Sequence, residues 1–65
     1  MLSMSYVIVR TSDDAFFNGW EGTAPRWSHY ADQRFYALIY TTESAVEQDL
    51  RLLQDQGFTV YVDEV

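Results

Sequence analysis

Hydrophobic residues that are mostly β-branched or aromatic gather in four segments of the chain and predict β-strands, and in residues 58–64 they alternate with polar ones. Residues 6–11 (YVIVRT) are β-branched and apolar on both faces, as is typical of a central strand. Residues 34–40 and 58–64 predict two further strands. Residues 15–20 predict a shorter one, in which Asn18-Gly19 forms either a turn or a bulge.

A helix is predicted between the last two of these strands. Thr41 or Thr42 can accept a hydrogen bond from a free backbone N–H, and Glu43 complements the positive end of the helix dipole. Gly57 can adopt the left-handed conformation that ends a helix, so we expect it to span residues 43–56.

The segments together predict one α+β domain over residues 1–65, with residues 1–4 disordered. The order is βββαβ, in a small antiparallel or mixed sheet of three to four strands with one helix packed on one face. Residues 21–33 are expected to be a loop, with or without one helical turn over 28–32.

One helix covers one sheet face, so the second apolar face also needs cover. Trp20, Trp27 and Tyr30 either fold over that face as a lid or stay partly exposed as an interface. Arg26 and Tyr36 would belong to such an interface, because Trp, Tyr and Arg dominate binding hot spots. In both cases we expect Trp20 and part of Trp27 to be buried.

Asp49 falls inside the apolar arc of the predicted helix, between Ala45 and Leu53. A buried carboxylate is costly without a partner. Arg10 or Arg34 could pair with it, or the helix could lie at the sheet margin with Asp49 in water. Alternatively, Asp49 lies in a groove where another protein docks.

The charge is strongly acidic, with ten Asp and Glu against four Arg, no Lys, and a net charge of −6. Such a chain repels nucleic acid and anionic membranes and attracts basic surfaces, so neither direct nucleic-acid binding nor membrane contact is expected. There is no Cys, no signal peptide is visible, and no apolar run approaches the ~20 residues of a membrane span. We expect a cytoplasmic protein.

Catalytic chemistry finds little support in the sequence. There is no Cys or Lys nucleophile, and His29 with Asp32 supplies only two ligands for a metal. We therefore expect no enzymatic activity, no metal and no cofactor.

The predicted helix carries Glu43, Glu47 and Asp55 near one polar face, at multiples of four residues and about 6 Å per step. This spacing approaches that of phosphates, so the face could act as a DNA mimic toward a basic protein. Arg51 interrupts the row, and a solvated face with a Glu47–Arg51 pair is the simpler interpretation.

In layout and composition the chain is similar to short phage and mobile-element proteins, including anti-CRISPR inhibitors. The segments that carry this likeness are Tyr6–Val9, Trp20, Ala37–Tyr40, Thr42–Ala45 and Gly57–Val62. The resemblance implies a non-enzymatic acidic protein-binding module that inhibits a basic, nucleic-acid-handling host complex. The alternative is a small homo-oligomeric structural or accessory protein, such as a homodimer, whose aromatic face pairs with itself. The candidate partner-binding residues are Trp20, Arg26, Trp27, Tyr30, Tyr36, Glu43, Glu47, Asp49 and Asp55.

Overall fold

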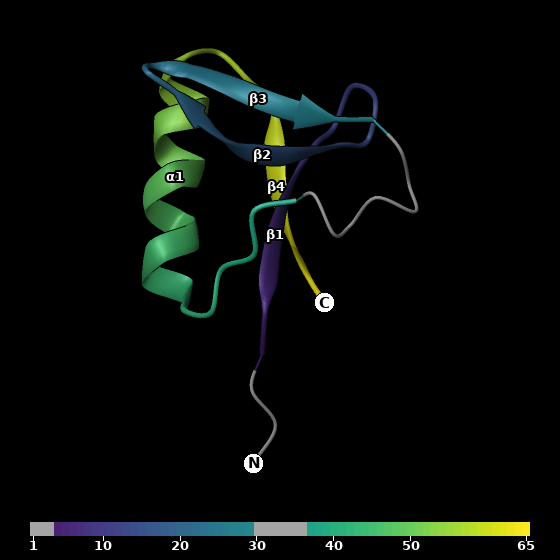
Figure 1. Cartoon of the computed structure of the whole chain (residues 1–65), viewed down its shortest axis with the longest axis vertical. Coiled ribbons are helices and arrows are strands. Elements are labelled where there is room, and N and C mark those ends of the chain that lie inside the picture. The colour runs from purple at the N-terminus through teal and green to yellow at the C-terminus, as the bar shows by residue number, and fades with distance from the viewer. Residues whose placement is uncertain (1–3, 30–36) are drawn as a thin grey trace.

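A computed structural model describes residues 4–29 and 37–65 of the chain. Its strands form one antiparallel sheet of order β3-β2-β1-β4, and α1 packs against β1 and β4 on one face (Figure 1). This confirms the predicted α+β class and βββαβ order. The elements are β1 (Tyr6–Arg10), β2 (Ala15–Glu21), β3 (Ala24–Ser28), α1 (Glu43–Asp55) and β4 (Val60–Glu64).

The predicted helix is confirmed together with both of its ends. Thr42 has extended backbone angles, and its side-chain oxygen accepts a hydrogen bond from the Ala45 N–H at 3.3 Å. Gly57 follows the C-cap with a φ of +95°, which favours glycine. No helix of the described residues is long and apolar enough to cross a membrane.

β2 bends away from β1 partway along its length. It pairs with β1 only at Val9↔Phe16 and Arg10↔Ala15, and its register with β3 shifts between Phe17 and Gly19. The shift is the bulge that Asn18-Gly19 was expected to allow, since a bulge bends its strand. In Figure 1, β2 and β3 accordingly run across the direction of β1 and β4.

The segment 37–40 fills the fork that opens between β1 and β2. The Leu38 N–H donates to the Phe17 carbonyl, and Tyr6 and Tyr40 exchange both backbone hydrogen bonds, each at 2.9 Å. Over residues 37–40 the predicted strand is wrong, because β2 already pairs with the end of β1 and leaves room for one isolated bridge. Residues 34–36 lie outside the described residues.

The expectation of a loop over residues 21–33 is wrong for Ala24–Ser28, which forms β3. A two-residue turn, Gly22-Thr23, joins β2 to β3, and its positive φ at Gly22 alone fits a type II′ turn. β3 contains Pro25, and a proline is tolerated there because this strand lies at the sheet edge. Residues 30–33 lie outside the described residues.

The larger hydrophobic cluster lies between the sheet and α1. Trp20 and Trp27 are half-buried against it, with ring centroids 5.1 Å and 5.7 Å from that of Phe17. Their partial burial is confirmed, whereas a lid formed by these two residues over the opposite face is wrong; Tyr30 lies outside the described residues. The buried members are Tyr6, Ile8, Phe17, Tyr40, Val46, Leu53 and Val60.

A second, smaller cluster lies on the opposite face of the sheet. It joins Val7 and Val9 of β1 to Phe16 and Ala37. Val7 and Ile8 are both fully buried although they point to opposite faces, which confirms β1 as a central strand.

Candidate partner-binding surface

Asp49 connects α1 to the aromatic side of the sheet. Its half-buried carboxylate accepts hydrogen bonds from the indole N–H of Trp20 at 3.2 Å and from the Tyr40 hydroxyl at 2.5 Å. Arg10, one of the two arginines that could pair with Asp49, pairs with Asp13 instead, so that prediction is wrong. The other, Arg34, lies outside the described residues. The bulge in β2 lets Trp20 and Phe17 share a face, which brings the indole to the helix.

This contact joins α1 to β2 and to the segment 37–40, and both donors, the indole of Trp20 and the hydroxyl of Tyr40, are neutral. Burial, followed by the hydrogen bond and the negative charge of Asp49, raises the pKa of Tyr40 well above its ordinary value. The hydroxyl therefore stays protonated at neutral pH and donates to the carboxylate. Asp49 thus serves the structure of the helix–sheet contact, with its remaining surface open to solvent.

An apolar groove lies between the C-terminal half of α1 and the tip of the β2–β3 hairpin. It has a volume of about 300 Å³, and two of its lining residues are joined by a hydrogen bond of 2.9 Å from Gln56 Nε2 to the Thr23 carbonyl. Leu52 forms part of its wall and remains 47% exposed. The groove is lined by Trp20, Gly22, Thr23, Leu52 and Gln56.

The outer face of α1 continues from this groove through Leu52. A shallow depression there is lined by Ser44, Glu47, Gln48, Arg51 and Leu52. Glu43, Glu47 and Asp55 are all exposed, so the helix presents an acidic row beside an exposed leucine. The expected Glu47–Arg51 pair is wrong, since none of the ion pairs found among the described residues involves α1.

A charged cluster lies at the other end of the sheet. The Arg10 guanidinium donates to both carboxylate oxygens of Asp13, at 2.9 Å and 2.7 Å, and lies 4.5 Å from the Trp27 ring centroid. His29 Nε2 lies 2.8 Å from Asp13 as well. The hydrogen bonds from Arg10 are the largest of the causes that hold the pKa of Asp13 far below its usual range.

Within this cluster the charges of Arg10 and Asp13 compensate each other. Of the two metal ligands that the sequence offered, His29 belongs to this cluster and Asp32 lies outside the described residues. Within residues 4–29 and 37–65, no three His, Asp or Glu side chains are grouped closely enough to hold a metal ion.

The candidate residues therefore separate into distinct places. Trp20 and Asp49 meet in one hydrogen bond, whereas Trp27 lies beside Arg10 and Phe58. Arg26 is exposed on the edge strand β3, 3.9 Å from Glu21. Tyr30 and Tyr36 lie outside the described residues, and the remaining candidates are the acids of α1.

The sequence missed Leu52 and the hairpin tip as parts of the surface. Leu52 belongs to the apolar arc of the predicted helix, and this favours a position in the core. Its place at the very end of that arc, in contrast to the buried Leu53, was the only available signal.

Comparison of the chain with protein-family models, curated proteins and solved structures finds no match. Fold and surface alone therefore define the class: a small antiparallel α+β domain with an acidic helix face beside an apolar groove.

Proposed function

We propose that the chain is a non-enzymatic, acidic protein-binding module that docks through α1 on a basic surface of another protein. The observation that carries this proposal is the exposed Leu52, which joins the apolar groove to the acidic outer face of the helix. An apolar centre with a charged rim is the usual anatomy of a protein interface.

The two parts of this surface contribute differently to binding. Covering the exposed part of Leu52 contributes roughly 1 kcal/mol, and the groove beside it can receive an apolar side chain of the partner. Glu43, Glu47 and Asp55 attract a basic surface over distance and thereby raise the association rate.

A protein that binds nucleic acid is the kind of partner whose surface best matches the acidic face of α1. Its basic surface is built to meet negative charges, and α1 exposes Glu43 and Glu47 four residues, about 6 Å, apart, with Asp55 two such steps beyond Glu47 and Arg51 between them. Together with the resemblance in layout and composition, this supports an inhibitor of a basic host complex, encoded by a phage or mobile element and acting in the cytoplasm. Competition with DNA or RNA for the partner would distinguish mimicry from binding elsewhere on it.

Self-pairing through an aromatic face has weaker support. Trp20 and Trp27 both pack in the helix-side cluster, which leaves less of each ring for a second copy. If the protein does associate with itself, we expect the acidic face of α1 to stay outside that interface, because like charges repel.

The test is a pull-down from host lysate with matched single variants. Glu47→Gln and Asp14→Asn each remove one exposed charge, on α1 and on the β1–β2 turn respectively. Leu52→Ser and Val65→Ser each remove an apolar side chain that is nearly half exposed.

We expect wild type and the two control variants, Asp14→Asn and Val65→Ser, to retain the same basic proteins. Retention should fall for Glu47→Gln and for Leu52→Ser. Equal retention by all four variants, with unchanged circular dichroism, would show that α1 is not the docking surface.

A further inference from the structure

The outer edge of β4 carries backbone groups that the sheet does not use. The Thr11 N–H donates to the Thr59 carbonyl and the Val65 N–H to the Ser5 carbonyl, each at 2.9 Å. Hydrogen-bonded pairs alternate along an antiparallel ladder, so the odd-numbered residues of β4 face β1. The residues whose N–H and C=O point away from the sheet are Val60, Val62 and Glu64.

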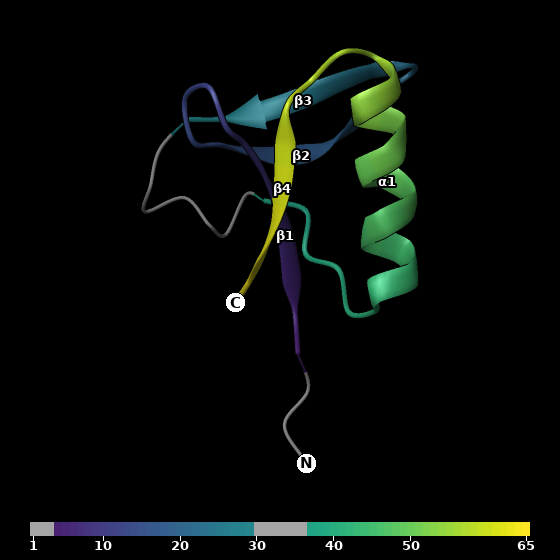
Figure 2. The ribbon, with the colours of Figure 1, turned by 180° about the vertical axis from the view of Figure 1, so that it is seen from behind.

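This edge is open in the described part of the chain. None of the three outward residues has a backbone hydrogen bond to another described residue. Figure 2 shows β4 nearest the viewer, with β1 behind it and α1 to one side. A free row of donors and acceptors is a template for another strand.

The opposite edge of the sheet is protected in ways that β4 is not. β3 contains Pro25, which has no N–H, and its register with β2 is broken at the bulge. β4 is regular over its full pairing with β1 and contains neither proline nor a basic residue. The β4 edge is therefore the one on which a strand can be added.

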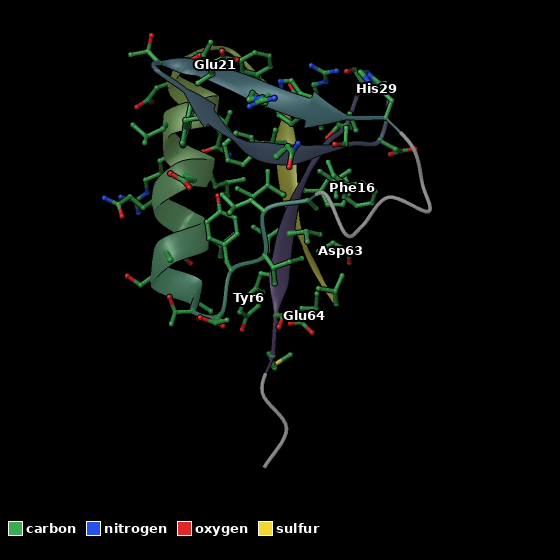
Figure 3. All side chains as sticks on the ribbon, in the orientation of Figure 1. Tyr6, Phe16, Glu21, His29, Asp63 and Glu64 are labelled. Carbon is green, nitrogen blue, oxygen red and sulfur yellow. The ribbon has the colours of Figure 1, made fainter. Side chains whose placement is uncertain are left out.

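The side chains along β4 define what kind of strand fits. Val60 and the exposed Tyr61 make its first half apolar, and Asp63 and Glu64, on opposite faces, make its last part acidic (Figure 3). Burial is the main cause that raises the pKa of Tyr6, and the negative charges of Glu43 and Glu64 raise it further. Negative charge is thus concentrated around this end of β1 and β4.

We propose that the β4 edge binds an extended basic segment of the partner protein, which adds a fifth strand to the sheet. Main-chain hydrogen bonds to Val60, Val62 and Glu64 supply affinity, and Lys or Arg opposite Asp63 and Glu64 supplies selectivity. The inference rests on the proposed function only in taking the partner to be basic, because the edge is separate from the outer face of α1. A second copy fits less well, since it brings two chains of net charge −6 together.

The probe is a short synthetic peptide of alternating valine and lysine, titrated into isotopically labelled protein and followed by NMR. A second peptide of equal charge, interrupted by proline, cannot extend the ladder. We expect the first peptide to shift the amide signals of Val60, Val62 and Glu64 and to slow their hydrogen exchange. The proline peptide should leave these signals unchanged.

Two variants separate the backbone contribution from charge. N-methylation of Val62 in synthetic protein removes one outward N–H and keeps every side chain. Glu64→Pro removes another N–H at an exposed position together with the Glu64 charge, so its backbone effect is read by comparison with Glu64→Gln. Each should weaken peptide binding by about tenfold. Glu64→Gln isolates the charge at the edge, and Asp14→Asn, which removes one exposed charge on the β1–β2 turn, is its matched control, expected to bind the peptide as wild type does.

Several results would overturn the inference. Equal binding of the proline peptide, or full binding after N-methylation of Val62, would reduce the contact to charge alone. A dimer that excludes the peptide and is lost on N-methylation would make a second copy the occupant. If Glu47→Gln and Leu52→Ser retain the basic proteins as well as wild type does, while the peptide still binds at β4, the proposed function is refuted and this inference stands.

Discussion

Replacing Asp49 with alanine removes the acceptor shared by Trp20 and Tyr40. Hydrogen bonds to a charged group contribute about 1.5–3 kcal/mol each. The carboxylate is only half-buried, so water reaches part of the site and some desolvation cost is recovered. We therefore expect a net loss of about 2–3 kcal/mol in the free energy of unfolding.

Such a loss is large for a chain of 65 residues. Domains of this length are stable by roughly 3–10 kcal/mol. Urea unfolding followed by tryptophan fluorescence measures the change, and a slope of about 1 kcal/mol per molar predicts a midpoint lower by about 2–3 M. Asp55→Ala, on the exposed side of the same helix, is the control, because it shares the gain in helix propensity.

A double-mutant cycle tests the contact itself. Asp49→Ala and Tyr40→Phe remove opposite partners of one hydrogen bond, so their costs should couple by about 1–2 kcal/mol. If Asp49→Ala unfolds like Asp55→Ala, or if the coupling vanishes, the carboxylate does not hold α1 to the sheet.

Three further predictions concern pH and the end of the helix. Because the pKa of Tyr40 is raised in the folded protein, its hydroxyl contributes fully to the free energy of unfolding below pH 10, and this contribution is lost progressively above that pH. Tyr40→Phe should therefore flatten the fall in the free energy of unfolding at alkaline pH. The lowered pKa of Asp13 makes its contribution complete well above pH 3.8 and lost as pH falls below that value, so Asp13→Asn should flatten the acid fall, measured by urea unfolding at each pH. Gly57→Ala should lower the thermal midpoint by several degrees, because φ is +95° there and costs alanine about 1 kcal/mol.

The elements with strong local signals were predictable from the sequence. β1 is apolar on both faces, Thr42 and Gly57 bound α1, and Asn18-Gly19 marks the bulge. Strand β3 was not predictable in this way, because it contains Pro25, a residue that strands disfavour, and because its pairing with β2 depends on the turn at Gly22.

The segment 37–40 shows how tertiary structure overrides a local pattern. Its apolar residues on both faces are typical of a central strand, yet β2 occupies the neighbouring position along Val9 and Arg10. Only Tyr40 finds a partner on β1, at Tyr6, and the rest of the segment bridges the fork.

The candidate surface was predictable only in part. The position of Asp49 in the apolar arc singled it out, but its partners lie 29 and 9 residues away in sequence. Trp20 meets it where β2 bends, and Tyr40 where it pairs with Tyr6 of β1. The exposure of Leu52 likewise depends on where the β2–β3 hairpin ends, which no local pattern reveals.

The salt dependence of association, measured once a partner has been captured, tests most directly whether α1 docks on a basic surface. Stopped-flow rates would be compared for wild type and for Glu43→Gln/Glu47→Gln at several salt concentrations. We expect the wild-type association rate to fall steeply as salt screens charges beyond about 8 Å, and the variant to start slower with a shallower fall. Association that is indifferent to salt up to molar concentration, and equal in the two proteins, would contradict docking through the acidic face of α1.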